Sequence, residues 1–300
     1  MAWMTKLHHV SLLTQSAAET DAFYRNVLGL RRVKNTVNQE NVHMRHLFYG
    51  DNLGTPGTVV TFFAIDHLGS RYDGANFLTD VHLWIPTGSL TAWHSRISAI
   101  CPVSATSDSL RFDDPSGVHL VLTEHPETLS PEAVVDNQIP AAEQILGLAT
   151  TDLVVQNPQA SLDFFSTMLN VDVINDSVPL ANGKIQVLPS HSDAIHRFGR
   201  GSMDHVAVSV TDDEQLLNLA TRAKQHGYEV EELADRGWFK SLYVREPNGN
   251  RIEFATTTPG FSLDEPLETM GQSLGLPPRF ESQRQAILTY FNDKGVDFND

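Results

Sequence analysis

Cysteine is nearly absent from this chain of 300 residues, which contains Cys101 alone. A single thiol excludes an internal disulfide and a thiolate-rich metal site, and it favours a reducing compartment. Basic residues are also scarce, since 21 Lys and Arg stand against 37 Asp and Glu for a formal net charge of −16. Nucleic acids and anionic membranes require basic patches, so we expect neither as a partner.

Long apolar runs are missing as well, because no stretch of the sequence approaches the length of a membrane-spanning helix. The N-terminus, Met1 to Lys6, lacks the apolar core of a signal peptide. Hydrophobic residues make up 41% of the chain and charged residues 19%, as in ordinary globular proteins. We therefore expect a soluble, cytoplasmic protein that is long enough for two domains or a repeated architecture.

A repeated order of elements organises the chain. A strand over residues 7–13 is followed by a helix over 17–28 with an apolar stripe and by strands around 30–36, 43–49 and 58–65. The same order restarts with a strand over 148–154 and a helix over 158–169, whose stripe repeats that of the first helix. Two further units open at 80–84 and 201–210 and close in aligned turn-and-strand segments, 114–121 and 246–253.

We therefore predict an α+β fold built from four βαβββ modules, at roughly 5–66, 78–125, 146–190 and 201–257. Strongly curved mixed sheets would form an N-terminal domain, 1–136, and a C-terminal domain, 146–260. The segment 137–145 is expected to be the linker between them. A C-terminal extension, 261–300, would follow, with an amphipathic helix near 281–291 that packs on the body.

Equivalent positions of the modules can be compared for metal ligands. The first strands carry His9, His82, Thr150 and His205. Among the closing strands, the second module has Val121 where the fourth has Glu253. His82 thus has only an apolar partner in its own module and is not expected to bind a metal.

Glu253 lies between two apolar strand residues, so its side chain should point to the opposite face from theirs. Burying an unpaired carboxylate is costly, so it needs a cation or hydrogen-bond donors. Together with His9 and His205, it would supply two imidazoles and one carboxylate, a set typical of non-haem Fe(II) centres that activate oxygen. His43 and His46 lie on a neighbouring strand, where they could face the same cavity or the surface.

Several segments resemble the vicinal-oxygen-chelate superfamily, which includes glyoxalases, bleomycin-resistance proteins and extradiol dioxygenases. The matching segments include Leu7–Val10, Val33–Asn38, Tyr49–Thr58, and the most specific one, Arg236–Phe261. Within the superfamily, the chain is most similar to ring-cleaving dioxygenases of the hydroquinone type. The resemblance covers nearly the whole chain.

The resemblance implies an Fe(II) centre, with Mn(II) as the alternative, held by His9, His205 and Glu253. It also implies that His8, Ser11, Arg236 and Tyr243 surround the substrate, with His8 and Tyr243 relaying protons and Arg236 orienting the ring. His8 would point to the other face of its strand unless the strand is bent there. Relatives commonly have a His-His pair at the second ligand, whereas this chain has Asp204-His205. We expect this difference to leave the metal site intact and to affect the substrate range and the rate.

The expected function is Fe(II)-dependent, extradiol-type ring cleavage of a hydroquinone or related dihydroxybenzene with O2, as in the degradation of aromatic compounds. The partners would be the small aromatic substrate and O2, and the edge strands leave room for a homo-oligomer. Two alternatives stay open on the same scaffold. One is a glyoxalase-like metal-dependent isomerase or thiol transferase, and the other is a metal-free protein that binds an aromatic antibiotic.

Overall fold

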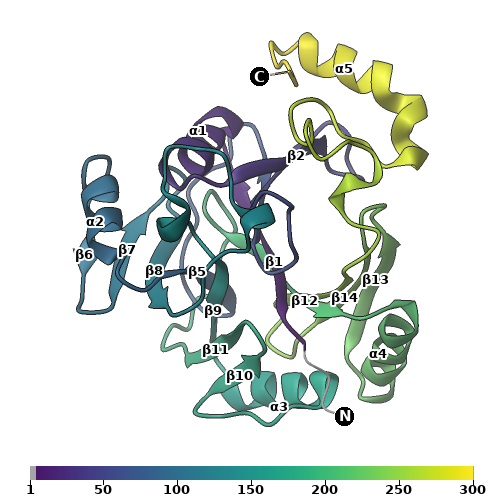
Figure 1. Ribbon diagram of the computed structural model, residues 1–300. Helices are drawn as coiled ribbons and strands as arrows, with labels where there is room; N and C mark the ends of the chain where they lie inside the picture. Colours follow the sequence, from purple (N-terminus) through teal and green to yellow (C-terminus); the bar gives the residue numbers. More distant parts are fainter. Residues whose placement is uncertain (1–4, 300) are drawn as a thin grey trace.

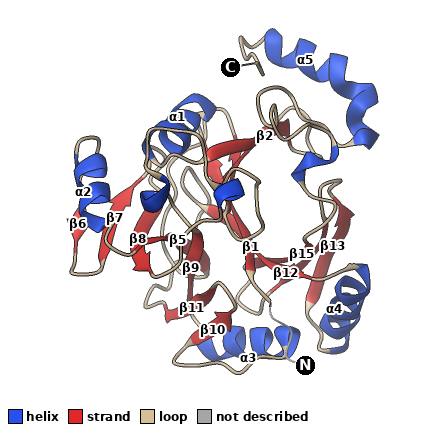
Figure 2. Ribbon diagram, viewed as in Figure 1, coloured by secondary structure: helices blue, strands red, loops and turns tan. Residues whose placement is uncertain are grey.

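The computed structural model describes residues 5–299 and confirms an α+β fold of repeated strand-helix-strand units (Figure 1). Residues 1–4, at the start of the expected N-terminal domain, and residue 300, at the end of the extension, lie outside the described residues. Strands occupy the middle of the molecule and helices lie around its outside (Figure 2). No helix within residues 5–299 is both long and apolar enough to cross a bilayer.

The first module follows the predicted order. It consists of β1 (Leu7–Thr14), α1 (Ala17–Ala22), β2 (Arg31–Val37), β3 (Arg45–Gly50) and β4 (Val59–Ala64). The side chain of Ser16 accepts a hydrogen bond from the backbone N–H of Glu19 and so caps the start of α1. The predicted helix continues beyond α1 as a π-helical turn, η1 (Phe23–Val27), which ends before Gly29 at φ 70°.

The second and fourth modules also contain one helix and three strands after the opening strand. The second has β5 (Phe77–Pro86), α2 (Leu90–Ser98), β6 (Ser104–Ala105), β7 (Ser109–Asp113) and β8 (His119–His125). The fourth has β12 (Met203–Val210), α4 (Asp213–Gln225), β13 (Glu229–Asp235), β14 (Lys240–Arg245) and β15 (Arg251–Thr256). The short 3-10 helices η2 (Pro131–Ala133) and η3 (Ala141–Glu143) lie before the third module.

The third module differs from the prediction, because only two strands follow its helix. It has β9 (Gly147–Val155), α3 (Pro158–Leu169), β10 (Ser177–Leu180) and β11 (Gly183–Pro189). Asn170, Asn175 and Asp176 all have positive φ, so the chain turns twice where another strand was expected. Between these turns, Ile174 makes no more than an isolated bridge to Ser177.

Each module closes on itself, because its first strand pairs in parallel with its last strand. These pairs are β1–β4, β5–β8, β9–β11 and β12–β15. Antiparallel pairing then joins the first module to the fourth through β1–β12 and the second module to the third through β5–β9. Within residues 5–299, the result is one 15-stranded sheet that is continuous through a short β5–β12 contact. The division into domains at 137–145 stays a prediction.

The main hydrophobic core lies beneath the helices and includes buried aromatic residues such as Tyr24, Phe62, Phe164 and Phe165. A second cluster contains Trp238, Phe239, Phe261 and Met270 and joins the fourth module to the chain beyond it. That chain forms η4 (Phe261–Leu263), η5 (Pro278–Gln283) and α5 (Arg284–Asn292), with α5 placed above β2 in the view of Figure 1. Its residues Leu274, Ile287, Phe291 and Phe298 are buried in a third cluster with Val37.

Candidate metal centre

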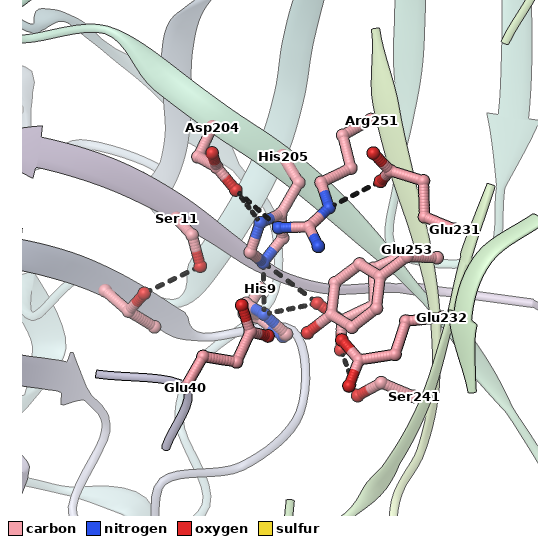
Figure 3. Close-up of polar contacts among 12 residues, drawn as sticks. His9, Ser11, Glu40, Asp204, His205, Glu231, Glu232, Ser241, Arg251 and Glu253 are labelled. Carbon is pink, nitrogen blue, oxygen red and sulfur yellow. Dashed lines mark hydrogen bonds and ion pairs between the residues drawn. The ribbon is translucent and has the colours of Figure 1, made fainter. Parts of the chain in front are cut away.

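Strand register brings His9, His205 and Glu253 together. On one side of β12, Ala207 pairs with His9 of β1, and on the other side it pairs with Glu253 of β15. His205 precedes Ala207 by two residues and so projects to the same face of the sheet. All three side chains therefore lie on one face of the sheet, and Figure 3 shows His9, His205 and Glu253 pointing toward one another.

The three facing atoms lie close to one another. Glu253 Oε2 lies 3.2 Å from His9 Nε2 and 2.9 Å from His205 Nε2, and the two imidazole nitrogens are 3.3 Å apart. All three residues are buried, and Glu253 has no exposed surface. Glu253 Oε2 has no hydrogen-bond partner of acceptable geometry within the described residues.

The remaining polar atoms of the three residues are held by neighbouring side chains. His205 Nδ1 lies 2.7 Å from Asp204 Oδ2, and His9 Nδ1 lies 2.8 Å from His8 Nδ1. The hydroxyl of Ser241 donates to Glu253 Oε1 at 2.5 Å. Metal ligands are commonly oriented by partners of this kind at the atom that does not face the metal.

These contacts fix where the lone pairs point. His8 Nε2 lies 3.2 Å from the carbonyl oxygen of Thr256, which can only accept, so His8 Nε2 carries the proton. His8 Nδ1 then accepts from His9 Nδ1–H, which leaves the Nε2 lone pair of His9 facing Glu253. Because Asp204 accepts from His205 Nδ1–H, neutral His205 presents Nε2 in the same way. Three lone pairs thus converge in a buried space, an arrangement that fits a bound cation.

The local charges agree with this arrangement. Burial and the neighbouring His9 lower the pKa of His8 to about 3, so His8 is neutral. Burial alone would lower the pKa of His205, but the carboxylates of Asp204 and Glu253 raise it to about 9. Burial opposes ionisation of Glu253, yet the two imidazoles hold the pKa of this carboxyl well below its usual range. Without a metal ion, His205 therefore holds a second proton at neutral pH, in the place that a bound cation would take.

His8 reaches the ligand cluster because β1 is bent. The register between β1 and β12 shifts between Leu7 and His9, which marks a bulge at His8. Without this bulge, the side chain of His8 would point away from that of His9, as alternation along a strand requires. His8 contacts His9 and Thr256 rather than the cavity, so the contacts favour an orienting role for it. The relay role expected from sequence stays a prediction.

A cavity of about 410 Å³ opens beside the cluster. Its lining includes residues that were predicted to bind the metal or surround the substrate: His9, Ser11, Asp204, His205, Arg236 and Tyr243. Tyr243 pairs directly with Glu253 across β14 and β15, and its ring meets that of His205 edge to face. Arg236 Nε donates to the Tyr243 hydroxyl at 3.3 Å.

Burial and the negative charge of Glu253 raise the pKa of Tyr243 above its ordinary value, although Arg236 opposes the shift. Tyr243 is therefore a phenol, not a phenolate, across the physiological range. Arg236 is held in turn by Glu40 at 2.8 Å and by Glu232 at 2.9 Å. These two carboxylates fix the guanidinium at the cavity wall.

Sequence reasoning missed Ser241 and Arg251, which hold Glu253 and Asp204. For His46 it left the cavity and the surface open, and His46 lines the cavity between the rings of Phe48 and Phe63. Ser241 precedes Tyr243 by two residues on one strand, so alternation was an available signal. His43 lies elsewhere, exposed and stacked on Tyr290.

His46 is connected to Ser11 through hydroxyl groups. His46 Nε2 lies 3.0 Å from Thr61 Oγ1, which lies 2.7 Å from Ser11 Oγ. Ser11 and Thr61 are buried. Burial and the nearby His205 lower the pKa of His46 well below its ordinary value, so His46 is a neutral polar group on the cavity wall.

Known proteins with similar sequences cover this chain almost completely. The "Putative ring-cleaving dioxygenase MhqA" of Bacillus subtilis is 35% identical over 94% of this chain and 96% of its own length. The "Chlorohydroquinone/hydroquinone 1,2-dioxygenase" of Sphingobium indicum is 27% identical over 96% of each chain. The model of the Glyoxalase/Bleomycin resistance protein/Dioxygenase superfamily matches residues 147–254.

Solved structures agree with this placement. A "putative dioxygenase" of Bacillus subtilis superposes with a TM-score of 0.86 at 28% identity and covers 95% of this chain and 96% of its own. Maize glyoxalase I shares the fold alone, with a TM-score of 0.60 at 11% identity over 85% of this chain and 93% of its own. The chain belongs to the Glyoxalase/Bleomycin resistance protein/Dioxygenase superfamily, in which it groups with the ring-cleaving dioxygenases of the hydroquinone type.

Proposed function

We propose that this protein is an Fe(II)-dependent dioxygenase that cleaves the ring of a hydroquinone or a related dihydroxybenzene with O2. The observation that carries the proposal is the convergence of His9, His205 and Glu253, whose facing atoms lie within 3.3 Å of one another. The activity named for the Sphingobium indicum relative supports hydroquinones as the substrate class. Extradiol-type cleavage, with both atoms of O2 entering the product, is the reaction we assign.

His9, His205 and Glu253 would hold the metal ion. Two imidazoles and one carboxylate with open positions suit Fe(II), and the same oxygen and nitrogen donors also accept Mn(II). When bound, the ion supplies Lewis acidity toward a substrate hydroxyl and a redox-active centre for O2. Asp204, His8 and Ser241 would keep the ligands oriented, each through the atom opposite the metal-facing one.

Tyr243 is suited to donate a proton or hydrogen bond to a substrate oxygen. Its hydroxyl accepts from Arg236 Nε, which leaves the phenolic hydrogen free for a further acceptor in the cavity. Its raised pKa keeps that hydrogen in place at neutral pH. Arg236 carries a positive charge at the same wall and would orient the substrate or stabilise negative charge that develops on it.

Aromatic side chains give the cavity a surface that fits a flat ring. Phe48, Phe63 and Phe239 line it, and the ring of Phe239 lies 5.5 Å from that of His9 between centroids. Their apolar surfaces would exclude water beside the metal-binding cluster, which strengthens the electrostatic interactions there. Ser11 and His46 would then offer hydrogen bonds to polar substituents of the ring.

The test is oxygen uptake by protein that has been loaded anaerobically with Fe(II) and mixed with methylhydroquinone, with catechol in parallel. We expect uptake with methylhydroquinone and a new ring-opened chromophore, and a slower reaction with catechol. A second loading with Mn(II) determines which ion supports turnover. The variant Glu253→Gln should lose both iron and uptake, and a fully active, iron-loaded Glu253→Gln protein would contradict the proposal.

The same experiment separates the two alternatives. An isomerase would bind metal but consume no oxygen, and a metal-free binding protein would retain no metal. Non-redox relatives on this scaffold generally use more carboxylates, whereas Glu253 is the one carboxylate among the three facing residues. Iron retention without uptake on either substrate would therefore favour the isomerase.

A further inference from the structure

A second group of metal-binding side chains lies where the second module meets the third. It consists of Asp80 and His82 on β5 and Asp152 on β9, and their ligand atoms all lie within 4.8 Å of one another. The two strands are antiparallel neighbours, with Thr79 paired to Asp152. From its own module alone, His82 had only Val121 as a partner. Asp80 belongs to the same strand as His82, and the pairing between modules supplies the second carboxylate, Asp152.

His82 has an imidazole nitrogen that lacks a partner. His82 Nε2 is buried and has no hydrogen-bond partner within residues 5–299. The nearest oxygen of Asp152, Oδ1, lies 3.7 Å away, which is too far for a hydrogen bond. Two ligands of one ion, each about 2.1 Å from it, are commonly separated by roughly 3–4 Å. The spacing therefore suits two ligands of one ion.

A strained backbone at Asp80 directs its side chain toward His82 and Asp152. The register of β5 against β9 shifts between Thr79 and Val81, and Asp80 between them has φ 35°. Non-glycine residues rarely adopt positive φ, and such strain is found where a side chain must be aimed. Asp80 is buried, and Arg111 of β7 donates to both of its oxygens. Arg111 thus fixes the orientation of the carboxylate, as partners of ligating carboxylates do.

The charges leave the group anionic. Two carboxylates and one guanidinium, from Asp80, Asp152 and Arg111, sum to a single negative charge beside the imidazole of His82. An uncoordinated lone pair on an imidazole and an excess carboxylate are both satisfied by a divalent cation. His82 and Asp152 are partly exposed, so an ion has access from solvent.

We propose that Asp80, His82 and Asp152 bind a divalent cation, distinct from the one at His9, His205 and Glu253. One imidazole and two carboxylates suit Zn²⁺, which serves as the probe. The ion would link β5 to β9 and so join the second module to the third. Because the three ligands are brought together only in the folded protein, binding of the ion should stabilise the folded state.

The test is calorimetric titration of the metal-free, full-length protein with Zn²⁺. We expect two equivalents for the native chain, one for Glu253→Gln and none for Glu253→Gln combined with His82→Ala. In the Glu253→Gln background, Zn²⁺ should raise the melting temperature, and His82→Ala should remove that increase. Asp152→Asn should behave as His82→Ala does.

His119→Ala is the matched control, because His119 also pairs with an aspartate of the second module but lies outside the group. It should leave the number of equivalents unchanged. The proposal is overturned if His82→Ala and Asp152→Asn bind as much Zn²⁺ as their parents, or if the double variant still binds one equivalent. If only the centre at His9, His205 and Glu253 fails to bind, the native chain takes up one equivalent of Zn²⁺ and His82→Ala abolishes it. If only the group at Asp80, His82 and Asp152 fails to bind, the native chain also takes up one equivalent, but His82→Ala retains it. The two failures are therefore distinguishable.

Discussion

Asp204 Oδ2 lies 2.7 Å from His205 Nδ1, so this carboxylate holds the imidazole beside it. Arg251 secures Asp204 from the other side, with Nη1 at 3.3 Å from the same oxygen. Burial opposes ionisation, but His205 and Arg251 lower the pKa of Asp204 to about 2. A permanently charged acceptor makes the imidazole more basic and thus a stronger ligand.

Substitution Asp204→Asn should therefore weaken Fe(II) binding by about 10- to 100-fold, the range seen when the hydrogen-bonding partner of a metal ligand is lost. The amide can still accept at its oxygen but has no charge, so His205 should remain in place with lower basicity. Competition with a chromophoric chelator measures the affinity. Asp213→Asn, which removes an exposed carboxylate of the same module, is the control. Equal affinities of the native and Asp204→Asn proteins would show that Asp204 has no such role.

Substitution Tyr243→Phe should lower kcat by about 100-fold or more, the usual effect of removing a general acid. Iron content should stay unchanged, because the Tyr243 hydroxyl is not among the three facing ligand atoms. The ring would still cover His205 and pack against Arg236 and Arg251. Steady-state oxygen uptake with metal analysis of the same sample separates the two effects. An unchanged kcat would remove Tyr243 from the chemistry, and Tyr228→Phe controls for the loss of a tyrosine elsewhere.

The metal-facing residues could be predicted because they depend on local signals. Alternation places Glu253 opposite its apolar neighbours, and the repeat aligns His9 with His205. Neither signal depends on knowing which modules pair. His82 was dismissed because its partner Asp152 belongs to another module, and that pairing is a property of the whole sheet.

Bulges and loops account for what else the sequence did not reveal. Alternation puts His8 on the wrong face, and only the shift in register at β1 reverses this. Asp80 likewise depends on a local strain that no pattern of hydrophobicity predicts. Glu40 reaches Arg236 from a loop of the first module, across 196 positions in sequence.

The buried lysine Lys34 should be essential for attachment of the C-terminal extension. It has no exposed surface and forms ion pairs with Asp264 at 2.6 Å and with Glu265. Substitution Lys34→Met leaves two carboxylates without their cation, which should lower the free energy of unfolding by about 3–5 kcal/mol. Guanidinium-induced unfolding measures the loss.

Replacing the two unpaired carboxylates as well tests why the free energy of unfolding falls. Lys34→Met combined with Asp264→Asn and Glu265→Gln should recover at least half of the lost stability, because no unpaired charge remains. Trp238 donates from Nε1 to Asp264 Oδ1 at 2.7 Å, and its side chain lines the cavity beside the metal-binding residues, so Lys34→Met should also raise KM. No recovery in the triple variant would mean that packing rather than charge causes the loss.

A buried aspartate, Asp114, should make stability depend on pH. Burial raises the pKa of its carboxyl to about 6, even though Ser116 and Val118 donate backbone N–H groups to it. Because the pKa in the folded state lies above the ordinary value of 3.8, protonation favours the folded state. This stabilisation is complete below about pH 4 and is lost as the pH rises through about 6.

Asp114→Asn cannot ionise but keeps an oxygen that accepts both backbone N–H groups, so it isolates the effect. The free energy of unfolding of the native protein, relative to that of the variant, should fall by up to about 3 kcal/mol between pH 4 and pH 7, since each unit of pKa shift is worth about 1.4 kcal/mol. Urea unfolding across this range measures both proteins. Parallel pH profiles would show that Asp114 ionises at the same pH in the folded and unfolded chains. In that case, the hydrogen bonds to its carboxylate would offset the cost of burying the charge.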